Sequence, residues 1–258
     1  MMKPHVLILH ATGTNRDHEA AWAVEAAGGQ PKIVHVNELH DRRAYLQEFQ
    51  MLILPGGFSY GDALGAGRMW ATDLRWLFQD ELARFIESGK PVLGICNGFQ
   101  ALVKSGWLPG PPEHGIQATL TRNASNRFEC RWVWLAADPG SPSVFTRGLA
   151  TAVYCPVAHG EGRFVPRDSA TLERLRTQHL IALTYTSAGG AQAGYPENPN
   201  GSVAGIAGIC NERGNVLGLM PHPEDHILPV QHPRWMRGEG GHLGLPLFAQ
   251  GVRYAAGH

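Results

Sequence analysis

Short apolar runs that alternate with helical patterns restrict the fold of this chain more than any other feature. The runs occupy residues 5–9, 32–36, 51–54 and 91–95. Continuous apolar strands are typical of sheets that helices cover on both faces, and their alternation with helices predicts parallel pairing. The first 105 residues therefore predict an α/β fold built around a mostly parallel sheet.

Helical patterns fill the segments between these runs. Thr14 or Asn15 is expected to cap a helix that continues to about Ala27, where the pair Gly28-Gly29 ends it. Further helices are expected over residues 41–49, 70–88, 97–105, 171–178 and 245–255.

The pattern changes after Gly106, where strand-like segments follow one another with turn signals between them. Strands are expected over residues 117–122, 130–136, 153–157, 180–185, 203–209 and 215–219, with a hairpin turn at 211–215. The chain contains no internal repeat and no low-complexity linker, so residues 1–258 are expected to form a single domain.

Charge and cysteine content exclude several classes of protein. The 22 basic and 22 acidic side chains balance, and no basic run is present, which argues against binding of nucleic acid. No apolar run approaches the roughly 20 residues of a membrane helix, so no membrane partner is expected. The four cysteines are scattered without a CxxC pair, which argues against zinc ribbons and disulfide frameworks. A reducing, cytoplasmic location is predicted.

The strongest local signal surrounds Cys96, where an apolar run leads through Gly94 and past Gly98 into a predicted helix. A strand, a sharp turn and a helix with small residues beside the cysteine form the thiol counterpart of a nucleophile elbow. The helix N-terminus would stabilise a thiolate, and the Asn97 N–H would face a developing oxyanion. The alternative is a structural cysteine, because free cysteines are commonly buried.

A thiol nucleophile needs a base, and the best context for one is His222-Pro223-Glu224, which follows an apolar run. His222 and Glu224 stand two residues apart, so an extended backbone would project both to the same side. Glu224 could then bind one ring nitrogen of His222 while the other nitrogen faces a thiol. Taken alone, the pair also fits a surface loop; together with Cys96 it predicts a Cys-His-Glu triad.

Gly56 and Gly57 follow the apolar run 51–54. A Gly-Gly pair at the carboxyl end of a parallel strand exposes backbone N–H groups, which suit a second oxyanion donor. An ordinary βα turn is the alternative, since glycine-rich turns are common. A phosphate loop is excluded, because no Gly-Lys-Ser/Thr sequence follows.

In this order, Pro-Gly-Gly, Gly-x-Cys-x-Gly and His-x-Glu resemble the class I (triad) glutamine amidotransferases. Further stretches resemble one subfamily, the glutaminase subunits of phosphoribosylformylglycinamidine synthase in purine biosynthesis. They are residues 57–62 (GFSYGD), 96–100 (CNGFQ), 123–128 (NASNRF), 155–164 (CPVAHGEGRF), 198–202 (NPNGS) and 206–211 (IAGICN). The resemblance covers roughly residues 4–226. It implies a three-layer, flavodoxin-like, mostly parallel sheet with helices on both faces.

The resemblance implies a catalytic role for each triad residue. Cys96 would attack the carboxamide of L-glutamine and form a glutamyl thioester. His222 would act as the base and then as the acid for the leaving ammonia, with Glu224 orienting it. Water would hydrolyse the thioester to glutamate.

Four further residues would hold the substrate and its oxyanion. The amides of Gly57 and Asn97 would form the oxyanion hole, while Gly56 and Gln100 would help to bind glutamine. No metal and no cofactor are implied for this chain. Ammonia would pass to an ATP-dependent synthetase subunit, accompanied by a small accessory subunit, and ATP and magnesium would bind that synthetase.

Two features depart from the pattern or compete with it. Asp225 stands where the subfamily usually has arginine, and the segment 226–244 is longer than expected, which suggests an insertion or extension that contacts a partner. His159 and Glu161 form a rival His-x-Glu pair. They are expected to shape the glutamine pocket or the surface facing the partner.

Two alternative functions remain open from the sequence. One is another triad enzyme, either an amidotransferase for a different acceptor or a cysteine hydrolase such as a peptidase. The other is a non-catalytic regulatory subunit of the same fold. The subfamily stretches disfavour the first, and the intact Cys96, His222 and Glu224 disfavour the second.

Overall fold

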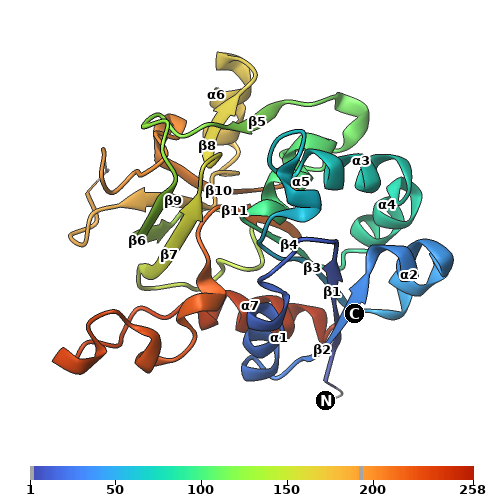
Figure 1. The fold of residues 1–258 in the computed structure, drawn as a ribbon, viewed down its shortest axis with the longest axis horizontal. Helices are drawn as coiled ribbons and strands as arrows, with labels where there is room; N and C mark the ends of the chain where they lie inside the picture. The colour runs from blue at the N-terminus through green and yellow to red at the C-terminus, as the bar shows by residue number, and fades with distance from the viewer. Residues whose placement is uncertain (1–2, 192–193) are drawn as a thin grey trace.

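A nine-stranded sheet with the order β2-β1-β3-β4-β11-β10-β9-β6-β7 runs through the molecule (Figure 1). The computed structural model describes residues 3–191 and 194–258. The strands are β1 (His5–His10), β2 (Gln30–His35), β3 (Met51–Leu54), β4 (Val92–Ile95), β5 (Ala118–Thr121), β6 (Glu129–Ala137), β7 (Val153–His159), β8 (Arg163–Pro166), β9 (Leu183–Thr186), β10 (Ile206–Cys210) and β11 (Val216–Leu219). Strands β5 and β8 form a separate two-stranded sheet.

The large sheet has a parallel half and an antiparallel half. Strands β2, β1, β3, β4 and β11 pair in parallel, whereas β10, β9, β6 and β7 continue the sheet with antiparallel pairing. The inner parallel strands β1, β3, β4 and β11 are largely buried and almost wholly apolar, as expected for strands between helical layers, whereas the edge strand β2 is only partly buried. The predicted α/β class is confirmed, and the parallel half carries the motifs identified in the sequence.

Helices cover both faces of the parallel half (Figure 1). One layer contains α1 and α7, which pack on β1, β2 and β3; the other contains α5, which packs on β3, β4 and β11, with α3 and α4 outside it. The helices are α1 (Asp17–Ala26), α2 (Val36–Asp41), α3 (Arg68–Trp76), α4 (Gln79–Glu87), α5 (Asn97–Ser105), α6 (Ser169–Thr177) and α7 (Leu245–Ala255). No helix in the described ranges is long and apolar enough to cross a membrane.

Two local expectations were wrong. The helix expected over 70–88 is two helices, because the N–H groups of Leu77 and Phe78 both bond to the Asp73 carbonyl and close α3, after which Phe78 enters the core. Neither Thr14 nor Asn15 caps α1; its N-cap is Arg16, and the Thr14 hydroxyl accepts the Ala11 N–H instead.

Other boundaries also differ from the expected ones. The helix expected over 41–49 is the 3-10 helix Arg43–Glu48, preceded by α2. Residues Val203–Gly205 form a 3-10 turn before β10 begins, and β8 was not expected at all. The hairpin turn at 211–215 is confirmed, since it joins the antiparallel pair β10 and β11.

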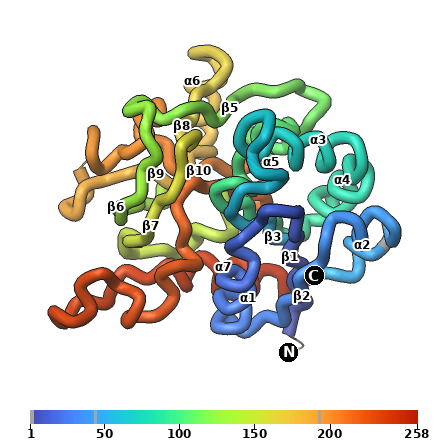
Figure 2. Tube along the Cα trace, viewed as in Figure 1, coloured from blue at the N-terminus to red at the C-terminus, as the bar shows by residue number. Residues whose placement is uncertain are grey.

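The segment 226–244 forms an arm that projects from the body of the molecule in the tube view (Figure 2). Three histidines hold it against strands β6 and β7: His226 packs on Trp132, His232 on Tyr154 and His242 on Trp134. These aromatic contacts tie the arm to the antiparallel half of the sheet.

Candidate active site

Strand register brings the three sequence motifs to one edge of the sheet. β3 pairs with β4 so that Leu54 lies opposite Gly94, and β11 pairs with β4 so that Leu219 lies opposite Ile95. Three parallel strands therefore end side by side, and the turns that follow them meet there. These turns carry Gly56-Gly57, Cys96 and His222.

Cys96 occupies the sharp turn between β4 and α5. Its backbone has φ 49° and ψ −102°, a left-handed conformation that is strained for a residue with a side chain. Its N–H donates to the Leu219 carbonyl at 2.8 Å, and its Sγ lies 3.9 Å from the Ala158 carbonyl oxygen. A Cβ on Gly98 would lie 2.0 Å from the Leu54 carbonyl oxygen, so glycine allows α5 to start this close to β3. The geometry is that of a nucleophile elbow.

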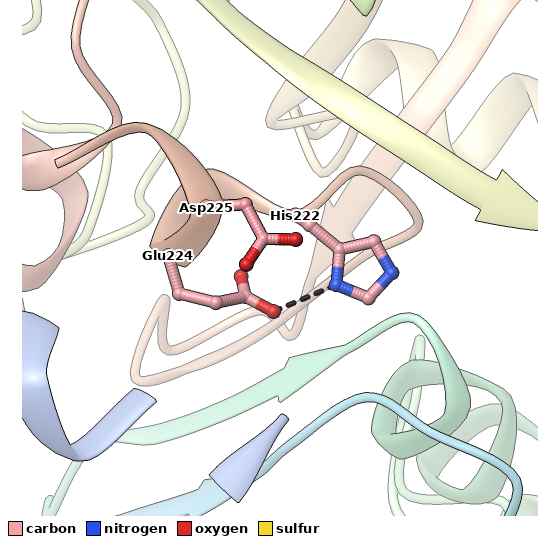
Figure 3. A group of neighbouring side chains, drawn as sticks. All are labelled: His222, Glu224 and Asp225. Carbon is pink, nitrogen blue, oxygen red and sulfur yellow. Dashed lines mark hydrogen bonds and ion pairs between the residues drawn. The ribbon is translucent and has the colours of Figure 1, made fainter. Parts of the chain in front are cut away.

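His222 and Glu224 form a buried hydrogen-bonded pair on the turn after β11 (Figure 3). The His222 Nδ1–H donates to Glu224 Oε1 at 2.7 Å. The His222 backbone N–H donates to the Pro156 carbonyl of β7 at 2.8 Å, which fixes the turn against the antiparallel half. The structure thus places the predicted base beside its predicted orienting acid, and their catalytic roles stay predictions.

The environment of His222 favours its charged form. Burial alone would lower the pKa of the imidazole, but the Glu224 carboxylate and the nearby Cys96 outweigh it and raise this pKa well above its usual value. A histidine that readily holds a proton beside a thiol can stabilise the thiolate as an ion pair. This is the electrostatic arrangement that a cysteine nucleophile requires.

The Gly56-Gly57 turn lies directly against the base. A Cβ on Gly56 would lie 2.5 Å from His222 Cε1, and Gly57, at φ 138°, approaches the backbone of Thr14 and Asn15. The next N–H groups along the turn are held in place, since Phe58 donates to the Gly13 carbonyl and Ser59 to the Asn97 side chain. Because α5 begins at Asn97, its first N–H groups point out of the helix N-terminus. The oxyanion roles of Gly57 and Asn97 stay predictions.

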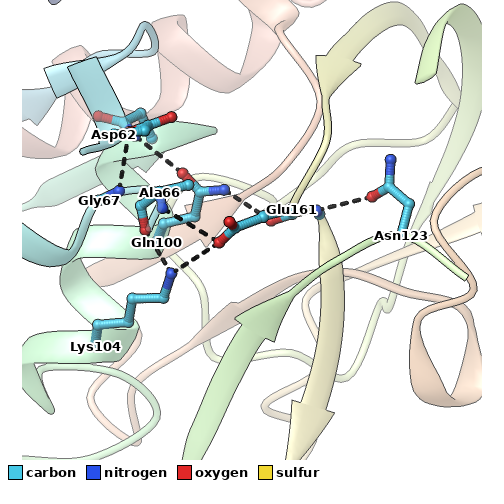
Figure 4. A network of polar contacts seen from close by, with 9 residues as sticks. Asp62, Ala66, Gly67, Gln100, Lys104, Asn123 and Glu161 are labelled. Carbon is cyan, nitrogen blue, oxygen red and sulfur yellow. Dashed lines mark hydrogen bonds and ion pairs between the residues drawn. The ribbon is translucent and has the colours of Figure 1, made fainter. Parts of the chain in front are cut away.

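Gln100 sits in a polar network behind the elbow (Figure 4). Its side-chain oxygen accepts from Asn97 Nδ2 at 3.0 Å, and its Nε2 donates to the Glu161 carbonyl at 2.7 Å. Asn97 Nδ2 also donates to Asp62 at 3.0 Å. Gln100 therefore joins the β7–β8 turn to the elbow, and its direct contact with glutamine stays a prediction.

Sequence reasoning named Glu161 as part of a rival His-x-Glu pair but did not predict that Glu161, Lys104 and Asn123 brace this network. Glu161 Oε2 accepts from the Ala66 N–H at 3.2 Å and lies 3.4 Å from Lys104 Nζ. Asn123 accepts the Gly162 N–H at 2.9 Å and donates to the His159 carbonyl at 2.8 Å. Asp62, Asn123 and Glu161 fall within the stretches that carry the resemblance, but the sequence alone did not predict which groups they contact.

His159, the rival base, lies in a different environment from His222. It is buried, and within the described ranges neither ring nitrogen has a hydrogen-bond partner. Burial, assisted by His222, lowers its pKa to about 4. A neutral imidazole without an orienting acid is a poorer candidate for the base than His222.

The donor atoms of His222, Glu224 and Asp225 lie within 4.8 Å of one another, a spacing that would also suit a metal ion. The His222–Glu224 hydrogen bond occupies one atom of each of these two side chains, and Arg16 lies 3.8 Å from Asp225. This arrangement is complete as a base with its acid, and the absence of a metal stays a prediction.

Replacing Glu224 with glutamine tests the electrostatics of the base. Loss of the carboxylate removes the main influence that raises the pKa of His222, so this pKa should fall. The alkaline limb of the pH profile for glutamine hydrolysis should move to lower pH, and kcat should drop about 100-fold. Glu87→Gln, which changes an exposed carboxylate, serves as the control. An unchanged pH profile in the Glu224 variant would contradict the assigned pairing.

The comparison with known families agrees with this geometry. The family model for CobB/CobQ-like glutamine amidotransferase domains matches residues 3–255, a range that includes the arm at 226–244. A putative GMP synthase subunit from Thermoplasma acidophilum shares the fold, with a TM-score of 0.58 at 15% identity over 100% of this chain and 96% of that one. Fold, site and family model together define a class I glutamine amidotransferase, and the chain belongs to this family.

Individual relatives show to which subfamily of the amidotransferases the chain belongs. PurQ subunits of phosphoribosylformylglycinamidine synthase from Treponema denticola and Dehalococcoides mccartyi are 47% and 46% identical to this chain; the alignments cover 98% and 99% of it, and 99% of each relative. The structure of PurLQS from Thermotoga maritima contains a chain with a TM-score of 0.74 and 32% identity, covering 98% of this chain and 99% of that one. Within the amidotransferases, the chain belongs to the PurQ subunits.

Proposed function

We propose that this chain is the glutaminase subunit of a phosphoribosylformylglycinamidine synthase. It would hydrolyse L-glutamine to glutamate and ammonia, and the ammonia would serve de novo purine biosynthesis. The observation that carries the proposal is the meeting of a strained Cys96 and the buried His222–Glu224 pair at the ends of β4 and β11. The alignment with PurQ subunits is nearly complete, so we infer that the ammonia goes to the acceptor of phosphoribosylformylglycinamidine synthase and not to that of another glutamine-dependent enzyme.

The mechanism follows from the residues at the site. The Cys96 thiolate attacks the carboxamide carbon, and the oxyanion that forms accepts hydrogen bonds from the Gly57 and Asn97 amides. His222, protonated and oriented by Glu224, gives a proton to the leaving nitrogen, and ammonia departs. Water, activated by the now neutral His222, cleaves the thioester and releases glutamate. Gly56 and Gln100 complete the glutamine pocket.

The partners are proposed from the relatives. The Thermotoga maritima structure is named for a PurL-PurQ-PurS assembly. By analogy, this chain would deliver ammonia to an ATP-dependent synthetase subunit with a small accessory subunit. ATP and magnesium would bind the synthetase, and this chain would need no cofactor of its own. A cytoplasmic location, without nucleic-acid or membrane partners, and a single domain that includes the arm are part of the same proposal.

The experiment that tests the function is the capture of its covalent intermediate. The chain is mixed with glutamine, with and without its synthetase subunits, quenched in acid, digested and analysed by mass spectrometry. A glutamyl adduct on the peptide containing Cys96 is expected, with higher occupancy in the complex because partner docking commonly completes such sites. Release of ammonia without an adduct, or an adduct on Cys130, Cys155 or Cys210, would contradict the mechanism.

A further inference from the structure

The side chain of Arg16 lies beside the turn that follows His222. Its Nε is 3.8 Å from the Asp225 carboxylate, and its Nη1 donates to Glu19 at 3.0 Å. The backbone N–H of Arg16 donates to the Gly56 carbonyl at 3.3 Å, and its Cγ would lie 3.5 Å from a Cβ built on Gly56. One residue at the start of α1 therefore contacts both the glycine turn and the turn that carries the base.

Asp225 is a partly buried acid in a charged neighbourhood. The titratable and charged groups that face it are Glu224 and His222 on its own turn, Arg16 and Glu19 at the start of α1, and Cys155 on β7. Arg16 is the one permanent cation in this set. Burial and the Glu224 carboxylate raise the pKa of Asp225 to about 6, while His222 and Arg16 act in the opposite direction.

Building on the proposed glutaminase function, we propose that Arg16 is a positioning residue for glutamine hydrolysis. By its contact with Asp225 it holds the turn of the base against the Gly56-Gly57 turn. The Asp225 N–H donates to the His222 carbonyl at 3.3 Å, so a displacement of Asp225 passes directly to the backbone of the base. Small errors in the position of a catalytic group are costly, because the reacting atoms must meet within narrow limits.

The Arg16–Asp225 contact also bears on the repulsion between two neighbouring acids, Glu224 and Asp225. A second carboxylate next to Glu224 repels it and favours protonation of one of the two. A cation nearby offsets this repulsion. Here the cation is Arg16, which comes from the start of α1.

Exchange of the two charges tests the proposal. We measure glutamine-dependent kcat and KM for Arg16→Asp, Asp225→Arg and the double variant, each assembled with the synthetase subunits. Arg16→Asp crowds a further acid beside Glu19, Glu224 and Asp225, and kcat should fall about tenfold with little change in KM. The double variant should recover to within about threefold of the native kcat, because the pair is restored. If the fold-decrease in kcat of the double variant equals the product of the fold-decreases of the two single variants, the proposal is overturned.

The pH profile supplies a readout that a purely structural role would not move. As pH falls through the pKa of Asp225, about 6, the carboxylate takes a proton, its attraction to Arg16 is lost and kcat should decline. Asp225→Asn should remove this acid-side inflection, and persistence of the inflection would count against the proposal. The control reverses Glu38 and Arg42, which also lie 3.8 Å apart but on α2 and its cap, away from the site; their exchange should leave kcat and the profile unchanged.

Product formation from free ammonia distinguishes failure of the proposed glutaminase function from failure of the positioning role. It bypasses the glutaminase site, so it should be native in every variant of the series and thereby show that the variants fold and assemble. If Cys96→Ala keeps glutaminase activity, the proposed function itself fails. If Cys96→Ala is inactive but every Arg16 and Asp225 variant matches the native kcat, only the positioning role fails.

Discussion

Cys96→Ala is expected to reduce glutamine-dependent activity by roughly 10³-fold or more, because Cys96 is the thiol beside the His222–Glu224 pair and is proposed to form the thioester. The side chain is small and almost fully buried, with 4% of it exposed, so the substitution should leave the fold intact. The complex should still use free ammonia, since the acceptor reaction is assigned to the partner. The measurement compares glutamine-dependent with ammonia-dependent product formation in the assembled complex.

Cys130→Ala is the matched control for this experiment. Cys130 is an exposed free thiol on β6, and its removal should change neither the glutamine-dependent nor the ammonia-dependent activity. Substantial glutaminase activity in the Cys96 variant would remove the nucleophile from the mechanism. Loss of the ammonia-dependent activity as well would instead indicate failure to assemble, which a melting curve and gel filtration would reveal.

Gly56→Ala is also expected to have a large effect, although it adds a single methyl group. The new Cβ would lie 2.5 Å from His222 Cε1 and 3.2 Å from Nδ1. The ring cannot move away freely, because its Nδ1 is held by Glu224 at 2.7 Å. Displacement of the base should lower kcat about 100-fold. Steady-state kinetics with glutamine in the complex measures this loss.

Gly241→Ala is the control for the added methyl group, because a Cβ there meets nothing within 4 Å. Its kinetics and melting temperature should be native. A Gly56 variant with native kcat would show that His222 has room to move, and the close approach of the two turns would then carry no catalytic importance. A crystal structure of the variant would reveal the displacement of the ring directly.

Local patterns predicted most of the parallel half of the fold. β1, β3, β4 and α5 follow from continuous apolar runs, a glycine-flanked cysteine and helical periodicity, all of which are visible within about ten residues. The break between α3 and α4 was missed, because a helical period continues across Leu77 and Phe78 while the burial of Phe78 decides where the chain turns. β8 was missed because it is short and, among the described residues, pairs with β5 alone, which is far away in sequence.

The sequence by itself determined which residues are predicted to carry the chemistry of this protein: the nucleophile, the base, its acid and the turn beside them, because residue types and spacings of two or three positions define those roles. The tertiary structure alone decided what holds them in place. Glu161 reaches Ala66 across 95 positions, and Arg16 reaches Asp225 from the opposite end of the chain. Such contacts depend on the register and curvature of a whole sheet. No local propensity encodes them, so they emerge only when the strands are assembled.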